Sequence, residues 1–253
     1  MEEAQVTLRL DVRRIDTRGT ETQMLDISRR HDKLQSQING LVQAAAQFLG
    51  EEWDGLIFPV DRDSEDDSDN TFFLTSPGNA EVATLPLPSY MGMDACHRLG
   101  LEGLANQELL LRQGQANDAL HEIRLALADK AVLFRTEVRH GRNYTMVSRA
   151  WKKVTDTEAV VKRHATVYWR CHRQMILIGA NSDLLACYQP LDKKDLRVST
   201  AVSDPNARGH WQDTLAWFWT MDILKDTDTN DWMSECKVSL QQLAKISFTD
   251  CNV

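Results

Sequence analysis

The chain has 253 residues, of which 42% are hydrophobic, 26% charged and 7% aromatic, and its formal net charge is −8 at pH 7. This composition excludes collagen-like, low-complexity and fully disordered chains, and the length suffices for one large or two small domains. The sequence has neither a secretion signal nor an apolar run near the roughly 18 residues of a membrane span, so we expect an intracellular protein, nuclear or cytoplasmic, without membrane contact.

The charge is distributed unevenly along the chain. Lys plus Arg minus Asp plus Glu amounts to −9 over residues 1–100, +5 over 101–175 and −4 over 176–253. A basic middle between acidic ends is compatible with a nucleic-acid surface, and also with an ordinary solvated helix face. Both interpretations stay open on the charge alone.

Two elements are predicted in residues 1–60. Residues 6–12 alternate apolar and polar side chains with period two, which predicts a short, half-buried strand. Residues 22–49 carry apolar side chains mostly at steps of three and four and end before Gly50, which predicts one long helix with a glycine cap. The apolar positions of this helix are Leu25, Leu34, Ile38, Leu41, Ala45 and Phe48.

Residues 61–90 are predicted to be a linker. Residues 61–70 hold six acidic side chains, one Arg and no apolar side chain, so nothing there offsets the entropic cost of ordering the backbone. The stretch up to residue 90 contains Pro77, Pro86 and Pro88 and lacks helical periodicity. We therefore expect a boundary within 60–90.

A helical domain is predicted over residues 91–235, with a long antiparallel hairpin over 115–179 as its centre. Two apolar series have helical spacing and are separated by a short basic turn around 140–147. The first series is Ala116, Leu120, Ile123, Leu127, Ala131, Phe134 and Val138, and the second is Val154, Val161, His164, Tyr168, Cys171, Met175 and Ile178. A short helix near 184–188 and an aromatic helix over 212–224 are expected to pack on them. The predicted fold class is mainly α, with minor strand content.

No catalytic residue, metal site, cofactor or small-molecule substrate is indicated by the motifs. The sequence has no P-loop, dinucleotide fingerprint, nucleophile elbow or zinc-protease motif, and its five cysteines form no C-x-x-C pair. Two Cys-His dipeptides, at residues 96–97 and 171–172, do not suit zinc, because adjacent side chains on a helix diverge by about 100°. Most acidic residues lie in hydrophilic loops, where they are not held for magnesium chemistry.

Basic side chains flank the apolar series of both hairpin helices. They would form a ridge for DNA phosphates, or else cover apolar surface and pair with nearby glutamates. The candidate nucleic-acid contacts are Arg124, Arg135, Arg139, Arg142, Lys152, Lys153, Lys162 and Arg163.

Two tryptophans of the predicted aromatic helix are candidate contacts for a protein partner. Trp217 and Trp219 cannot both face one core on a helix, because side chains two positions apart point in different directions. One of them is expected to lie against another element or a partner.

Five segments in order resemble the C-terminal region of KDZ-type transposase-like proteins of mushroom-forming (basidiomycete) fungi. The resemblance covers roughly residues 104–235, about half of the chain, and the combination of the first segment with the DPNARG turn is its most specific part. The segments are LRQGQANDAL at 111–120, SRAW at 148–151, DLRVST at 195–200, DPNARG at 204–209 and LAWFW at 215–219.

The resemblance implies descent from a DNA-transposon protein. The catalytic part of that family is an RNase H-like fold whose acidic residues bind Mg²⁺, and it would precede the matched region. None of those acids can be matched here, so the resemblance implies a helical remnant that lacks the catalytic core and has a DNA-related, nuclear ancestry. The family pattern breaks off after Glu235, and we expect residues 236–253 to be an unstructured tail.

The sequence therefore favours a transposon-derived helical protein without its own catalysis, which retains DNA or protein contacts through the basic hairpin. The first alternative is a helical protein–protein interaction module. The second is a divergent Mg²⁺-dependent nuclease or transposase.

Overall fold

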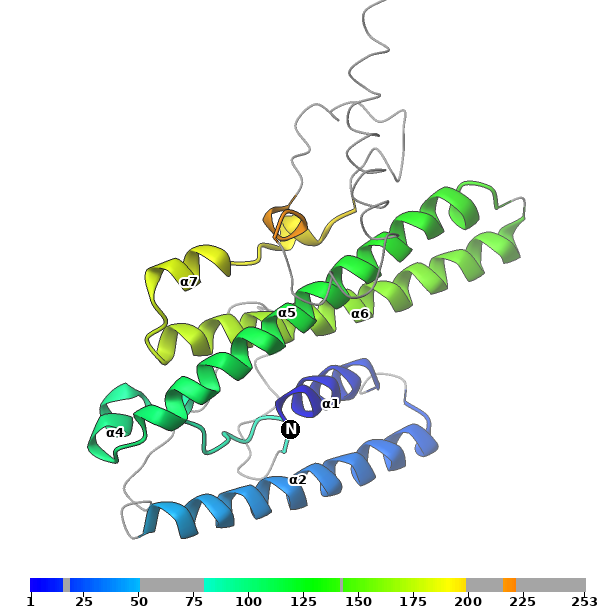
Figure 1. Cartoon of the computed structure of the whole chain (residues 1–253). Coiled ribbons are helices and arrows are strands. Elements are labelled where there is room, and N and C mark those ends of the chain that lie inside the picture. The colour runs from blue at the N-terminus through cyan, green and yellow to red at the C-terminus, as the bar shows by residue number, and fades with distance from the viewer. Residues whose placement is uncertain (16–18, 51–79, 142, 199–215, 222–253) are drawn as a thin grey trace, which may run out of the picture. The chain divides into compact units, whose positions relative to one another are not determined.

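The computed structural model describes residues 1–15, 19–50, 80–141, 143–198 and 216–221, and every regular element within them is helical (Figure 1). This confirms the predicted mainly α fold. The α-helices are α1 (Glu2–Ile15), α2 (Glu21–Leu49), α3 (Pro88–Met91), α4 (Met93–Arg98), α5 (Glu102–Leu133), α6 (Tyr144–Leu177) and α7 (Ser182–Cys187). A π-helical segment (Phe134–Val138) continues α5, and 3-10 turns lie at Lys193–Leu196 and Trp217–Trp219. Over these described residues, no helix is both long and apolar enough to cross a membrane.

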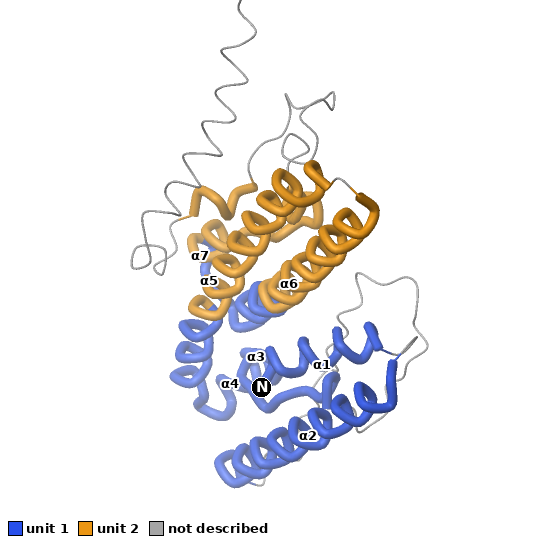
Figure 2. The backbone as a smooth tube through the Cα atoms, turned by 90° about the vertical axis from the view of Figure 1, so that its right-hand side faces the viewer, with its two compact units in different colours: residues 1–112, 170–182 blue, residues 113–169, 183–253 orange. Residues whose placement is uncertain are grey.

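The chain forms two compact units (Figure 2). Unit 1 comprises residues 1–112 and 170–182, and unit 2 comprises 113–169 and 183–253. Both long helices, α5 and α6, contribute residues to each unit. The units change at residues 112/113, 169/170 and 182/183, whereas the sequence analysis expected a linker at 61–90 and a domain over 91–235.

The predicted strand at 6–12 is wrong, because these residues lie within helix α1. The period-two alternation takes account of the apolar side chains alone, whereas the buried residues of α1 also include Glu2 and Gln5. Gln5 and Val6 follow Glu2 by three and four positions, which is the spacing of one helix face. The first turn is acidic and the last turn is basic, which matches the helix dipole at both ends.

Helix α2 confirms the helix predicted over 22–49. Thr20 begins it with a capping box: its side chain accepts a hydrogen bond from the Gln23 N–H, and the Gln23 side chain accepts one from the Thr20 N–H. Of the predicted apolar positions, Leu34 and Ile38 are buried, whereas Phe48 is exposed.

The linker prediction is wrong for residues 80–90, which are packed into unit 1. The Gln5 amide of α1 donates to the carbonyls of Ala80 and Ala83 at 2.9 and 2.8 Å, and the Ala80 N–H donates to His31 of α2 at 3.2 Å. The acidic residues 61–70 lie outside the described residues. The core that joins these segments consists of Leu8, Leu34, Ile38, Ala80 and Leu85.

The antiparallel hairpin is confirmed, although its first helix begins at Glu102 instead of near residue 115. In unit 2, α5 and α6 run side by side in Figure 1, and the ion pair between Lys130 and Glu158, at 2.7 Å, joins them. Every member of the second apolar series is buried. In the first series the four positions from Ala116 to Leu127 are buried, whereas the three nearest the turn are half-buried.

The segment after α7 is fastened to both hairpin helices within unit 2. The Tyr168 hydroxyl and the Trp169 indole N–H donate to the carbonyls of Gln189 and Leu191, both at 2.7 Å, and the hydroxyl of Tyr188 is 3.0 Å from the Asn117 amide oxygen. The expected helix over 212–224 is described only in part, where it is a single 3-10 turn at Trp217–Trp219. The expected tail at 236–253 lies outside the described residues.

Candidate nucleic-acid interface

The basic character of residues 101–175 is concentrated at one end of the hairpin. Residues 132–153, called the hairpin tip below, hold six Lys or Arg and one acid, Glu137, whereas the other residues of 101–175 hold seven of each sign. The tip therefore carries the entire excess of +5. The tip comprises the end of α5, the π-helical segment, the turn and the first turns of α6, and it lies within unit 2.

The tip is held by contacts across the two helices and by one contact within the first of them. The rings of Phe134 and Trp151 meet edge to face, with centroids 5.9 Å apart and an interplanar angle of 80°. Lys153 Nζ lies 2.6 Å from Glu137 Oε1, and Lys130 Nζ lies 6.0 Å from the centre of the Phe134 ring. These contacts fix the ends of the helices relative to each other, so the cations are presented on a defined scaffold.

The π-helical segment widens α5 where it enters the tip. In it the Arg139 N–H bonds to the carbonyl of Phe134, five residues earlier. Single π turns inside α-helices are frequent at functional sites, since they redirect side chains relative to a regular helix. The segment places exposed Arg135 and Arg139 at the tip.

Exposed cations dominate the tip. Its exposed positive side chains are Arg135, Arg139, Arg149, Lys152 and Lys153. Lys153 is engaged by Glu137, the only acid of the tip, so its charge is partly balanced. Together the five exposed cations give the tip a positive surface suited to phosphate groups.

Large apolar side chains lie exposed among these cations. Tyr144 is 87% exposed and Trp151 is 49% exposed, and Met146 and Val132 are also more than half exposed. Aromatic rings beside guanidinium and ammonium groups are the usual composition of surfaces that contact bases as well as phosphates.

The prediction that Arg124 contacts DNA is wrong. Arg124 is 0% exposed, and its guanidinium donates to the carbonyl of Phe218 and to that of Met221, the latter at 2.6 Å. It fastens the 3-10 turn at 217–219 to α5. A buried guanidinium with carbonyl partners is not accessible to a phosphate.

The other predicted cations fall into two groups. Arg135, Arg139, Lys152 and Lys153 belong to the tip. Lys162 and Arg163 are further along α6, where Lys162 is exposed and Arg163 is half-buried with its guanidinium 3.3 Å from His164. Arg142 lies outside the described residues.

The two candidate partner contacts, Trp217 and Trp219, are not fully exposed side chains. Both are half-buried, and Phe218 between them is fully buried. Trp217 lies against Tyr168 of α6 with ring centroids 6.0 Å apart. Trp217 thus packs the turn against the hairpin, whereas the described ring contact of Trp219 is with Phe218 of the same turn.

Sequence reasoning missed three residues of the tip: Arg149, Tyr144 and Trp151. Arg149 and Trp151 lie within the SRAW segment, which was used only for the family resemblance and not as a candidate binding site. The signal that would have found them is the charge count in a shorter window, since residues 132–153 alone account for the excess.

Residues of metal-ligating types, cysteines among them, are spread over the described part of the chain. No group of three or more His, Cys, Asp or Glu side chains there could hold a metal ion. Cys96 and Cys171 are buried thiols, and burial raises the pKa of each, that of Cys171 to about 12. Burial therefore disfavours the thiolate, the reactive form, in both residues.

No family model, curated protein or solved structure matches the chain. The resemblance to KDZ-type transposase-like proteins thus remains a prediction from the sequence.

Proposed function

We propose that this chain is a transposon-derived helical protein without catalysis of its own, and that it contacts DNA through the hairpin tip. The observation that carries the proposal is the concentration of charge: the tip holds the whole positive excess of the basic middle of the chain, and the five cations of the tip that the structure describes are all exposed. Its transposon descent rests on the sequence resemblance over 104–235.

Phosphate contact is the interaction that such a tip supports best. Each guanidinium or ammonium that neutralises a phosphate releases condensed counterions, so affinity grows with the number of exposed cations. Exposed Arg135, Arg139, Arg149 and Lys152 lie on both helices of the tip. A backbone contact of this kind carries no sequence information, so we expect binding with little base preference.

The alternative that the tip binds a protein is favoured by its apolar side chains. Tyr144 and Trp151 are of the residue types enriched in protein interfaces. The two candidate functions differ in salt dependence, because apolar contacts respond weakly to ionic strength whereas phosphate contacts respond strongly.

The test compares the wild type with the variant Arg135→Gln/Arg149→Gln/Lys152→Gln on a labelled 30-bp duplex, by fluorescence anisotropy at low salt. Each substitution removes one exposed charge without emptying a core position. We expect binding to weaken by about tenfold or more, as several phosphate contacts are lost.

A matched control removes the same three charges from unit 1, in the variant Arg29→Gln/Lys33→Gln/Arg98→Gln. These side chains are also exposed. We expect this control to bind nearly as well as the wild type. Equal losses in the two variants would show only a general charge effect, and absence of wild-type binding would refute the proposal.

A further inference from the structure

Two aromatic side chains of the hairpin tip are exposed on one face of α6. Tyr144 is 87% exposed and Trp151 is 49% exposed. They lie seven positions apart, which is close to two turns of an α-helix, so both rings project from the same side of α6, about 10 Å apart along its axis. The tip therefore presents two flat apolar groups to solvent.

The start of α6 holds Tyr144 in a defined position. Asn143 Oδ1 accepts a hydrogen bond from the Met146 N–H at 2.9 Å, and the Asn143 carbonyl accepts one from the Val147 N–H at 3.1 Å. Asn143 thus caps the helix directly before Tyr144. The backbone of Tyr144 is ordered while its ring stays exposed, which lowers the entropic cost of binding through that ring.

Positive side chains lie beside the second ring. Arg149 precedes Trp151 by two positions and Lys152 follows it directly, and both are exposed. Arg135 is exposed on the other helix of the tip, next to Phe134, whose ring meets that of Trp151 edge to face. Phosphates bound by these cations bring the bases attached to them within reach of the rings.

A ring at the protein surface can stack only on bases that are not already stacked between neighbours. In a duplex each base lies within the stack, whereas single strands expose base faces on which aromatic side chains stack with little sequence preference. Charge alone favours the duplex, because the salt slope is about −0.9 per neutralised phosphate for the duplex and about −0.7 for a single strand. A preference for single strands would therefore come from the rings.

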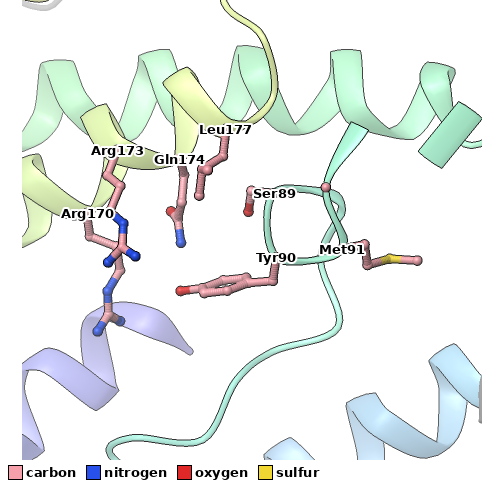
Figure 3. A pocket seen from close by; sticks show the side chains of 8 residues that line it. Ser89, Tyr90, Met91, Arg170, Arg173, Gln174 and Leu177 are labelled. Carbon is pink, nitrogen blue, oxygen red and sulfur yellow. The ribbon is translucent and has the colours of Figure 1, made fainter. Parts of the chain in front are cut away.

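A tyrosine also lies near arginines in unit 1, but its setting is different. Tyr90 lines a cavity together with Arg170 and Arg173, and its hydroxyl points toward their guanidiniums (Figure 3). This ring is only 8% exposed, and its hydroxyl donates to Glu2 Oε1 at 3.2 Å. Tyr90 is thus part of the packing of unit 1, whereas the rings of the tip are available to a ligand.

We propose that the hairpin tip binds single-stranded DNA more tightly than duplex DNA. Tyr144 and Trp151 stack on unpaired bases, while the exposed cations beside them hold the phosphates of the same strand. The inference rests on the proposed function, because it specifies which form of DNA the same tip prefers.

The test measures fluorescence anisotropy of the full chain with three labelled ligands: the 30-bp duplex, one of its strands alone, and a strand of the same length whose sugars carry no bases. The base-free strand keeps the phosphates but has no base faces for stacking. We expect the natural single strand to bind at least about fivefold more tightly than either of the other two ligands at the same salt concentration.

The variant Tyr144→Leu removes one ring at an exposed position, and Tyr144→Phe keeps it. Tyr144→Leu should weaken binding of the single strand by about fivefold and change duplex binding by less than about twofold, whereas Tyr144→Phe should bind like the wild type. The matched control is Phe48→Leu, which removes a ring that is 73% exposed in unit 1 and should change neither affinity.

The outcomes separate this preference from the proposed function. A single strand that binds no more tightly than the duplex or the base-free strand would overturn the preference and leave the proposed function intact. Equal effects of Tyr144→Leu on the single strand and the duplex would do the same. Absence of binding to all three ligands would refute the proposed function and the preference with it, and would favour a protein partner for the exposed rings.

Discussion

Arg112 joins segments of unit 1 that lie far apart in the sequence. Its guanidinium donates to Glu108 Oε1 from Nε and Nη2, at 3.1 and 2.8 Å, and to both carboxylate oxygens of Glu2. Glu108 in turn accepts from the N–H and hydroxyl of Ser89, at 2.9 and 2.7 Å. Arg112 is only 4% exposed, so its guanidinium bonds to both carboxylates in a buried setting.

The substitution Arg112→Met should therefore be strongly destabilising. It removes the guanidinium that bonds to both buried carboxylates, and removal of one partner of a buried pair costs about 3–5 kcal/mol. The free energy of unfolding from urea titration measures the loss. A loss below about 1 kcal/mol would mean that the network contributes little.

The network also makes a prediction about pH. Burial alone would raise the pKa of Glu2, but the hydrogen bond and charge of Arg112, the charge of Arg170 and the hydrogen bond from Gln174 outweigh it, so the pKa is lower than the ordinary 4.5. Glu2 therefore stabilises the fold above its unfolded pKa, and this contribution is lost as pH falls below about 4.5 through the lower, folded value.

The variant Glu2→Gln isolates this contribution. Its stability deficit relative to the wild type should be largest near pH 7 and should shrink in acid, as measured by urea midpoints across the pH range. Glu3→Gln, at an exposed position of the same helix, serves as the control. A deficit that stays constant or grows in acid would contradict the assignment.

Thiol reactivity tests the burial of the cysteines. Cys187 is exposed, whereas Cys96 and Cys171 are buried. Iodoacetamide at neutral pH followed by peptide mass spectrometry should modify Cys187 in the native protein, and the two buried thiols only after addition of urea, because the thiolate is the reacting form. Rapid native modification of Cys171 would contradict its raised pKa.

At the scale of elements, the long helices were predictable and α1 was not. Both hairpin series have helical spacing over many turns, and packing of the two helices follows that spacing directly. In α1 the buried face includes Glu2 and Gln5, whose bonds to Arg112 and Ala80 span 110 and 75 positions, so a short window cannot reveal why they are buried. The apolar subset alone has the pattern of a strand.

The start of α2 makes a prediction for a single element. Thr20→Ala removes the side chain that accepts from the Gln23 N–H, and loss of such a cap costs about 1 kcal/mol. Urea unfolding should show this loss, and Thr20→Ser should retain the stability. Ser28→Ala, at an exposed position within the helix, should change little, and an equal loss there would contradict a capping role.

At the scale of the whole molecule, the positive charge of the candidate interface was predictable from the sequence. Which residues belong to that interface was predictable only in part. The basic middle region is evident from counting, and five of the eight predicted cations fall within the tip, four of them described as exposed. Arg124 was misassigned because its partners, the carbonyls of Phe218 and Met221, come from a turn more than 90 residues later. Spacing along a helix gives the face of a side chain but not what packs on that face.

The salt dependence of duplex binding is the most direct test of the hairpin tip. The logarithm of the binding constant should fall linearly with the logarithm of KCl concentration, with a slope of about −0.9 per neutralised phosphate. We predict that Arg135→Gln/Arg149→Gln/Lys152→Gln makes this slope less steep by about two to three, one unit for each lost contact. A wild-type slope near zero, or equal slopes for wild type and variant, would contradict a phosphate-binding tip.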